Sequence, residues 1–150
     1  MKIVLAAIRG RRERKEGAME RLAEEYVARS TRYVACEAQN FEDEAQMLKW
    51  MERQAGREPG HLILLDRVGE MATSEEFAGR IRRLQESGVQ RVVFGIGPAD
   101  GWSGAARGEA RALLSFGPMT LPHELARVVA AEQIYRALTI LVGHPYHSGH

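Results

Sequence analysis

Histidine and tyrosine side chains gather at the C-terminal end of the sequence, in the segment HPYHSGH. Imidazole can bind zinc and can also accept a proton near neutral pH. A closed zinc site is disfavoured, because the segment contains proline and glycine and has no cysteine or carboxylate beside it. Tyr146 and the imidazoles could instead stack on a nucleobase and contact phosphate, whereas the alternative is a frayed chain end. The histidines follow one another at intervals of three: His144, His147 and His150.

Three apolar segments are followed by loops that could bind a ligand, since ligands of open α/β sheets bind beyond the carboxyl ends of strands. The first loop begins at Leu65 and Asp66. The second, 95–101, contains Gly97 and two more glycines that would allow close backbone approach. Its spacing, GxGxxxG, differs from the dinucleotide-binding fingerprint, so an ordinary turn between strand and helix is the alternative.

The third loop, 116–121, is apolar, and exposing it to water would be costly. It could wrap an apolar ligand such as adenine, with backbone N–H and C=O groups reading the ligand's edges. The alternative is that Met119 and Leu121 fill the core. His123 follows at the start of a helix, where a capping or surface role is the commoner one for histidine.

The last predicted helix begins at Pro122 and runs to Gly143, with apolar residues on both sides. A helix of this kind is covered on two sides, by its own sheet and by something else. Arg127 falls within the apolar arc. An unpaired buried guanidinium would be expensive, so we expect Arg127 to face a pocket, an acidic partner or a second subunit.

The elements that must position these residues alternate between strand and helix. Strands are predicted at 2–8, 33–38, 61–65, 91–96 and 113–116. Helices are predicted at 17–29, 41–55, from Thr73 or Ser74 to Gly88, and in a short Ala-rich segment ending near Ala112. The pattern predicts an α/β fold, a mainly parallel sheet with helices on both faces, in one domain over 1–150.

The bulk composition excludes several classes of protein. The 150 residues carry a formal net charge of +1, so there is no global basic footprint for nucleic acid. A local cluster of cations, Arg9, Arg11, Arg12, Arg14 and Lys15, could bind phosphate or be a solvated turn. No apolar run is long enough to span a membrane, and the N-terminus has no signal-peptide pattern. The lone cysteine, Cys36, fits a reducing cytoplasm.

Taken together, these segments closely resemble one family. The pieces TLPH, RVVAAEQIYRA and HPYH, in this order, resemble the C-terminal part of the bacterial large-subunit rRNA pseudouridine N3-methyltransferases. These are small members of the SPOUT class, whose chains form a trefoil knot. The resemblance extends through GIGPADGWS, HLILLDRVG and the opening strand, so it covers essentially the whole chain.

The resemblance implies a homodimer that binds S-adenosylmethionine as methyl donor, with no metal, and methylates N3 of a pseudouridine in helix 69 of 23S rRNA on the ribosome. It implies catalytic or proton-accepting roles for His144, Tyr146 and His147. Substrate contacts are expected from His123, Arg127 and Arg9. Cofactor contacts fall by position on Leu65, Gly97, Phe116, Gly117, Pro118, Met119, Thr120 and Leu121.

Three departures from the family pattern stand out. Pro98 replaces a second glycine and removes a backbone N–H. Ile8-Arg9 replaces Gly-Lys after the first strand, and Ser148 replaces a basic residue in the tail. Pro98 motivates the alternative function, a ribosome-binding module that has lost transfer activity. A nucleotide hydrolase is disfavoured, because the sequence has no phosphate-binding loop or nucleophile elbow.

Overall fold

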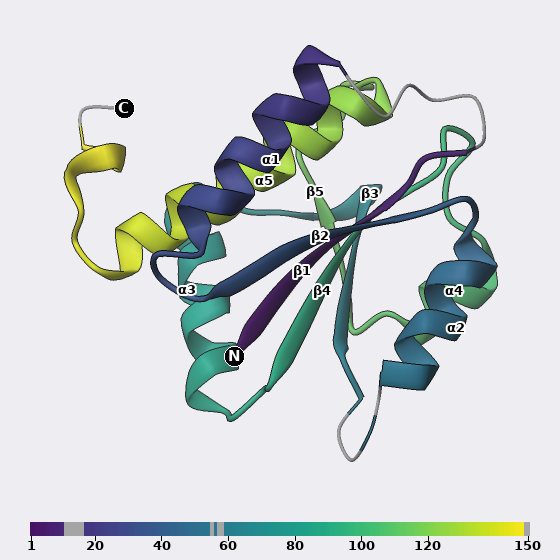
Figure 1. Cartoon of the computed structure of the whole chain (residues 1–150), viewed down its shortest axis with the longest axis horizontal. Helices are drawn as coiled ribbons and strands as arrows, with labels where there is room; N and C mark the ends of the chain where they lie inside the picture. The colour runs from purple at the N-terminus through teal and green to yellow at the C-terminus, as the bar shows by residue number, and fades with distance from the viewer. Residues whose placement is uncertain (11–16, 55, 57–58, 149–150) are drawn as a thin grey trace.

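The computed structural model describes residues 1–10, 17–54, 56 and 59–148. These residues form a five-stranded sheet in the order β2-β1-β4-β3-β5, and each strand pairing is parallel (Figure 1). The α/β fold with a parallel sheet is therefore confirmed. In chain order the elements are β1 Lys2–Ile8, α1 Ala18–Ser30, β2 Ala35–Phe41, α2 Glu44–Gln54, β3 His61–Met71, α3 Ser74–Glu86, β4 Arg91–Ile96, α4 Gly104–Glu109, β5 Ala112–Ser115, α5 His123–Leu141 and the 3₁₀ helix η1 Pro145–His147.

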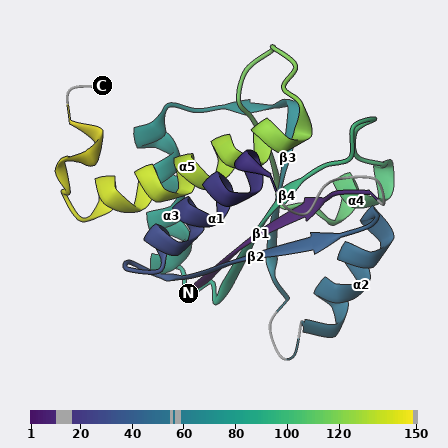
Figure 2. The same ribbon diagram turned by 45° about the horizontal axis from the view of Figure 1, so that its top comes forward.

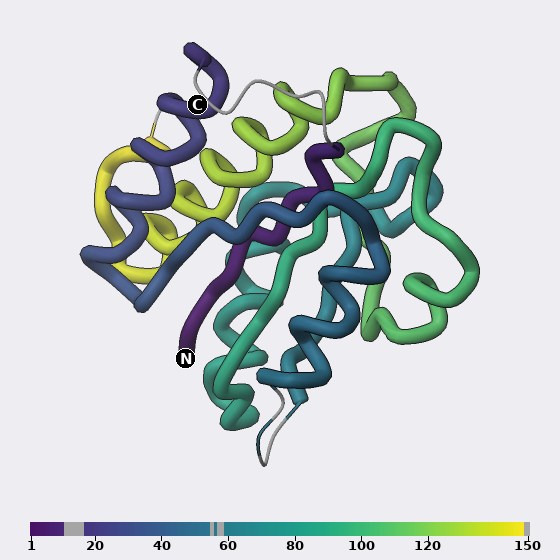
Figure 3. The backbone as a smooth tube through the Cα atoms, turned by 45° about the vertical axis from the view of Figure 1, so that its right-hand side comes forward, coloured from purple at the N-terminus to yellow at the C-terminus, as the bar shows by residue number. Residues whose placement is uncertain are grey.

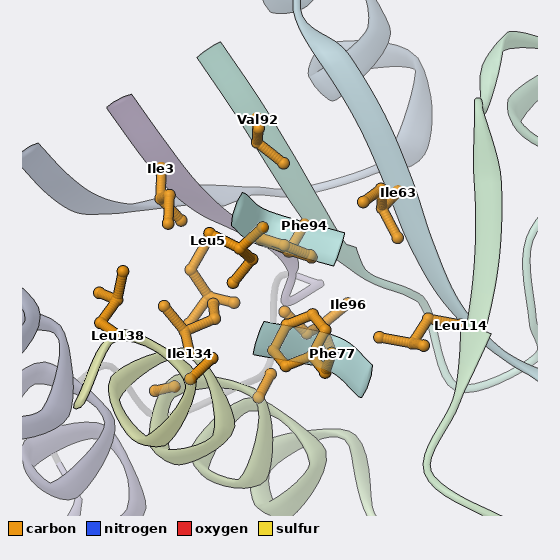
Figure 4. Packing of buried hydrophobic residues seen from close by; sticks show 14 of the residues in the cluster. Ile3, Leu5, Ile63, Phe77, Val92, Phe94, Ile96, Leu114, Ile134 and Leu138 are labelled. Atoms are coloured by element: carbon orange, nitrogen blue, oxygen red, sulfur yellow. The ribbon is translucent and has the colours of Figure 1, made fainter. Parts of the chain in front are cut away.

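Helices cover both faces of the sheet because successive strand side chains point to opposite sides. On one face, Ile3, Leu5 and Phe94 pack with α1, α3 and α5, and Figure 4 shows Ile134 and Leu138 of α5 against this layer. On the other face, Val4, Ala6 and Val93 pack against α2, α4 and the buried Trp102. The tube view shows the sheet lying between the two helical layers (Figure 3).

Helix α5 is buried along one broad side, whereas Leu125 and Val129 on its other side are only partly buried, so cover of both sides stays a prediction. The helix packs beside α1 and α3, and its inner face contacts β1 and β4 (Figure 2). Pro122 is its N-cap, so helical residues begin at His123, and Gly143 follows its end with a φ of +71°. No described helix is both long and apolar enough to cross a membrane.

Both ends of the second predicted strand are wrong, as are the start of the helix that follows it and the end of the short Ala-rich helix. The second strand begins at Ala35 rather than 33, because the N–H groups of Tyr33 and Val34 bond back to Ser30 and close a turn after α1. It extends to Phe41, which pairs with Ile8, and α2 therefore starts at Glu44. The short helix also ends earlier than predicted, at Glu109, since Ala112 pairs with Ile63 in the sheet.

The third strand is the larger correction. It was expected to end at Asp66, but β3 continues to Met71 with a register shift between Leu65 and Glu70. Gly69 makes this path possible: a Cβ placed there would lie 2.5 Å from the backbone carbon of Leu113. The irregular stretch directs residues 66–68 toward the cleft described next.

Candidate functional site

The three strand-end loops meet at the carboxyl edge of the sheet and line one cleft of about 840 Å³. Such a volume lies within the range of roughly 300–1,000 Å³ that is common for small-molecule sites. Of the residues implied to bind the cofactor, the following line it: Leu65, Gly97, Phe116, Gly117, Met119, Thr120 and Leu121. Pro118 lies between lining residues. The loops are thus brought together from three separate parts of the chain.

Trp102 forms part of the cleft lining and was missed by the sequence reasoning. Its Nε1–H donates to the carbonyl oxygen of Leu65 at 2.9 Å, which ties the second loop to the first. The indole lies against Gly95 and Gly97: a Cβ at Gly97 would lie 2.7 Å from Trp102 Cε2. The sequence does contain a signal for this contact. Gly97 lies five residues before Trp102, and a glycine has no side chain to keep an aromatic ring away from the backbone.

A charged pair, Asp66 and Arg107, forms part of the cleft lining and was not predicted. Arg107 of α4 donates to Asp66 Oδ2 from Nε at 3.0 Å and from Nη2 at 2.8 Å. The other oxygen, Oδ1, accepts the N–H of Val68 at 3.0 Å and holds the irregular part of β3 in shape. Asp66 therefore links β3 to α4, and its side chain is nearly buried.

The third loop keeps its path through one hydroxyl and one glycine. Ser115 Oγ lies 3.2 Å from the carbonyl oxygen of Arg67 and accepts the N–H of Gly117 at 3.0 Å. Gly117 has a φ of +114°, a region that residues with a side chain rarely adopt. Met119 is 84% exposed, so it does not fill the core, and Leu121 is half-buried at the cleft. Core filling by Met119 is therefore excluded, and ligand binding by this loop stays a prediction.

His123 and Arg127 lie one turn apart on α5 and face different surroundings. His123 lines the cleft. Arg127 is 4% exposed, is absent from the cleft lining, and pairs through Nη1 with Glu20 Oε2 of α1 at 2.5 Å. Of the expected partners for Arg127, the structure shows an acidic one within the same chain.

Glu20 also binds Arg9. The Arg9 Nη2 atom lies 2.9 Å from Glu20 Oε2, and the side chain of Arg9 is buried. Arg9 and Arg127 thus share one carboxylate, and neither of them lines the cleft. The other cations of the basic cluster, Arg11, Arg12, Arg14 and Lys15, lie outside the described residues, as does His150.

The tail is docked on its own chain, away from the cleft. The hydroxyl of Tyr146 donates to Glu132 Oε1 at 3.0 Å, and its ring lies 4.7 Å from that of Tyr135. His147 lies between Arg136 of α5 and Glu75 of α3, at 3.0 Å and 2.8 Å. His144 caps η1 by accepting the Tyr146 N–H at 3.1 Å.

The docked conformation favours the neutral phenol of Tyr146. Burial, with hydrogen bonds to Tyr26 and Glu132, raises the pKa of Tyr146 well above its usual value. A phenol that stays protonated is a donor, so Tyr146 does not accept a proton in this conformation. Within the described part of the chain, no three His, Cys, Asp or Glu side chains group as metal ligands.

Tail and cleft are separated by much of α5. The tail contacts Glu132 and Arg136, which lie roughly 14 and 20 Å along the helix axis from His123 at 1.5 Å per residue. Of the implied site residues, the structure therefore gathers the cofactor set and His123. It does not bring His144, Tyr146 and His147 to the same cleft within one chain.

Relatives of known name match most of the chain. A family described as "Predicted SPOUT methyltransferase" matches residues 1–147. Ribosomal RNA large subunit methyltransferase H of Koribacter versatilis is 48% identical over 136 residues, or 91% of this chain and 92% of that protein. The protein of the same name from Methylocella silvestris is 46% identical over 94 residues, or 62% of this chain and 59% of that protein.

Solved structures share the fold at low sequence identity. The SpoU methyltransferase AviRb from Streptomyces viridochromogenes, crystallised with AdoMet, is 15% identical with a TM-score of 0.51; the match covers 95% of this chain and 58% of AviRb. A probable methyltransferase from Bordetella pertussis is 13% identical with a TM-score of 0.52, over 91% and 95% of the two chains. Because the family match runs from β1 to the docked tail and includes every loop of the cleft, this chain belongs to the SPOUT methyltransferase family.

Proposed function

We propose that this protein transfers a methyl group from S-adenosylmethionine to N3 of a pseudouridine in the helix 69 loop of 23S rRNA, on the assembled ribosome in the cytoplasm. The observation that carries the proposal is the single cleft formed by the three strand-end loops. The near full-length relative from Koribacter versatilis, named for methylation of large-subunit rRNA, supports the substrate class. The pseudouridine and its position come from the resemblance of the tail and loop motifs.

The cleft residues fit an adenosine-containing methyl donor. Phe116, Met119 and Leu121 offer apolar surface to a base, and the backbone of the same loop offers donors and acceptors for its edge. Leu65, Gly97, Gly117, Pro118 and Thr120 complete the proposed set. A sulfonium donor supplies an electrophilic methyl group, so the protein needs no covalent nucleophile.

The chain's own task is then to orient the base and accept its imide proton. N3 loses that proton and bonds to the methyl carbon as the carbon–sulfur bond breaks, which leaves a neutral thioether. His123 contacts the substrate in this proposal, which its position in the cleft lining supports. Substrate contacts by Arg9 and Arg127 stay a prediction, since both face Glu20 here.

His144, Tyr146 and His147 take part if a second copy brings its tail to this cleft, so the proposal includes a homodimer. Exposed apolar side chains near the cleft support an interface there: Val68, Met71, Phe116 and Met119. The partly buried Val129 and Gln133 of α5 border the same region. A composite site would explain why the tail residues share no cleft within one chain.

Mass spectrometry of 23S rRNA from cells with and without the gene tests the reaction. We expect one methylated pseudouridine in helix 69 to disappear with the gene and to return when purified protein and S-adenosylmethionine are added to the mutant ribosomes. Unchanged rRNA in the deletion strain would overturn the proposal.

A second measurement separates the enzyme from the inactive binding module that Pro98 suggests. Calorimetry should detect S-adenosylmethionine binding by the purified protein, and ribosome binding should weaken steeply with salt, because phosphate contacts release counterions. Ribosome binding without cofactor binding or methyl transfer would favour the binding module.

A further inference from the structure

The ring of His147 is held from both sides by residues of different helices. Nδ1 lies 3.0 Å from Arg136 Nη1 of α5, and Nε2 lies 2.8 Å from Glu75 Oε1 in the first turn of α3. The side chain of His147 is 23% exposed, and that of Glu75 is 64% exposed. Both ring nitrogens are thus engaged, although only one of them can carry the proton of a neutral imidazole.

The chemistry of the two partners decides which nitrogen that is. A guanidinium has N–H groups and no acceptor, so Arg136 can only donate, and Nδ1 must accept. The proton therefore lies on Nε2 and is donated to the Glu75 carboxylate. The hydrogen bond from His147 lowers the pKa of Glu75, which keeps this carboxylate ionised as an acceptor.

Arg136 is itself fixed in the orientation that this contact needs. Its Nε and Nη2 donate to Glu132 Oε1 at 2.9 and 2.7 Å, which leaves Nη1 directed at the imidazole. Its guanidinium also lies 4.9 Å from the centre of the Tyr146 ring. Because Glu132 accepts from the Tyr146 hydroxyl too, one carboxylate anchors both the tyrosine and the arginine.

We infer that Glu75 and Arg136 are positioning residues that hold His147 in one tautomer, with the proton on Nε2 and Nδ1 presented as the acceptor. Glu132 holds Arg136 in place for this. The inference rests on the proposed function for its catalytic meaning: Nδ1 is the ring nitrogen without a proton, so it accepts the imide proton once a substrate N–H displaces that of Arg136. The Glu75 carboxylate then orients the histidine base by accepting the hydrogen bond from Nε2–H.

Two-bond ¹H–¹⁵N correlation spectra of the full-length ¹⁵N-labelled protein test the tautomer directly, with His147 assigned from His147→Gln. We expect the Nε2–H pattern in the unsubstituted protein. Arg136→Met keeps an apolar stem but removes the donor, and should give a mixture of tautomers. Glu75→Ala removes the carboxylate that accepts from Nε2–H. The proton on Nε2 should then exchange faster with water, and its signal should broaden. Glu86→Ala, at the other end of α3, is the matched control and should change nothing.

Methyl transfer to ribosomes gives the second readout. Glu75→Ala should lower kcat by roughly tenfold or more with the KM for S-adenosylmethionine unchanged, and Glu75→Gln should restore most of it, because an amide oxygen still accepts from Nε2–H. An Nδ1–H pattern in the unsubstituted protein overturns the inference, as does a Glu75→Gln variant as slow as Glu75→Ala. An Nε2–H tautomer in a protein that never methylates ribosomes overturns the proposed function and leaves the positioning intact.

Discussion

At the scale of single residues, Gly97 shows how the absence of a side chain shapes the cleft. The Trp102 indole occupies the space that a Cβ at Gly97 would need, and its hydrogen bond to Leu65 holds two loops together. We expect Gly97→Ala to displace the indole, lower the free energy of unfolding by about 1–3 kcal/mol and weaken S-adenosylmethionine binding. Urea unfolding and calorimetry measure the two effects.

The matched control is Gly108→Ala in α4. A Cβ at Gly108 would meet no atom within 4 Å, so this change should be neutral or stabilise by about 0.5–1 kcal/mol. Equal losses in both variants would contradict the role given to Gly97.

Cys36 gives a prediction about pH. Burial, with the nearby Glu37 carboxylate, raises the pKa of the Cys36 thiol from 9.0 to about 12. Because the unfolded chain releases this proton first, the stability that Cys36 contributes is complete below pH 9 and is lost as pH rises from 9 toward 12. Under reducing conditions the free energy of unfolding should fall by about 1 kcal/mol between pH 8 and 10 for this group alone. A Cys36→Ala variant with the same pH slope as the parent would contradict it.

Which site residues could be predicted depends on whether their role is local. Leu65, Gly97 and the 116–121 loop follow strands along the chain, so their place at the sheet edge could be inferred. Trp102, Arg107 and Glu75 act through partners many residues away, and one sequence carries no record of such pairs. Arg127 was expected to need a partner, but only the structure identifies Glu20.

At the scale of elements, β4 was predicted residue for residue, whereas β3 was not. A strand that is buried on both faces can be recognised from its continuous apolar sequence, as in Arg91–Ile96. The second half of β3 is largely exposed and mixes charged residues with exposed Val68 and Met71, and its last residues are strand because β5 pairs with them. Pairing of that kind depends on the neighbour and leaves no apolar pattern in the segment itself.

The close approach of β3 to β5 makes Gly69 the most sensitive position of this element. A Cβ there would lie within 2.6 Å of three backbone atoms of Leu113 and Leu114, and backbone cannot move aside as a flexible side chain can. We expect Gly69→Ala to cost about 1–3 kcal/mol or more and to shift the β5 amide signals in NMR spectra. A fully stable variant with unchanged β5 signals would mean that the two strands are not held this closely.

At the scale of the whole molecule, the separation of tail and cleft leads to a test of subunit cooperation. Thr120→Trp should block the cleft from an exposed position, and His147→Ala should disable the tail, so each variant alone should be inactive. If each site combines one cleft with the partner's tail, co-expression should restore about one quarter of the activity, since half of randomly formed dimers contain one intact site. Measuring methylation by the purified mixture decides this, because a site built within one chain would stay inactive.

The overall architecture followed from the sequence because strand and helix alternate and several strands are continuous apolar runs. The docking of the tail could not be derived in this way. Its contacts use Glu75, Glu132, Tyr135 and Arg136, whose types are equally compatible with an exposed helix face. Their arrangement appears only when α3 and α5 are packed side by side.

The position of Trp102 also allows ligand binding in the cleft to be followed by tryptophan fluorescence. The sequence has two tryptophans. Trp50 lies on α2 with its ring against Phe41, on the face of the sheet that α5 does not cover. The Trp102 indole forms part of the cleft wall. In a Trp50→Phe background, emission would come from the cleft alone. Any occupant that excludes water or polarises the indole would then change its wavelength or intensity, so occupancy could be followed in real time without a label.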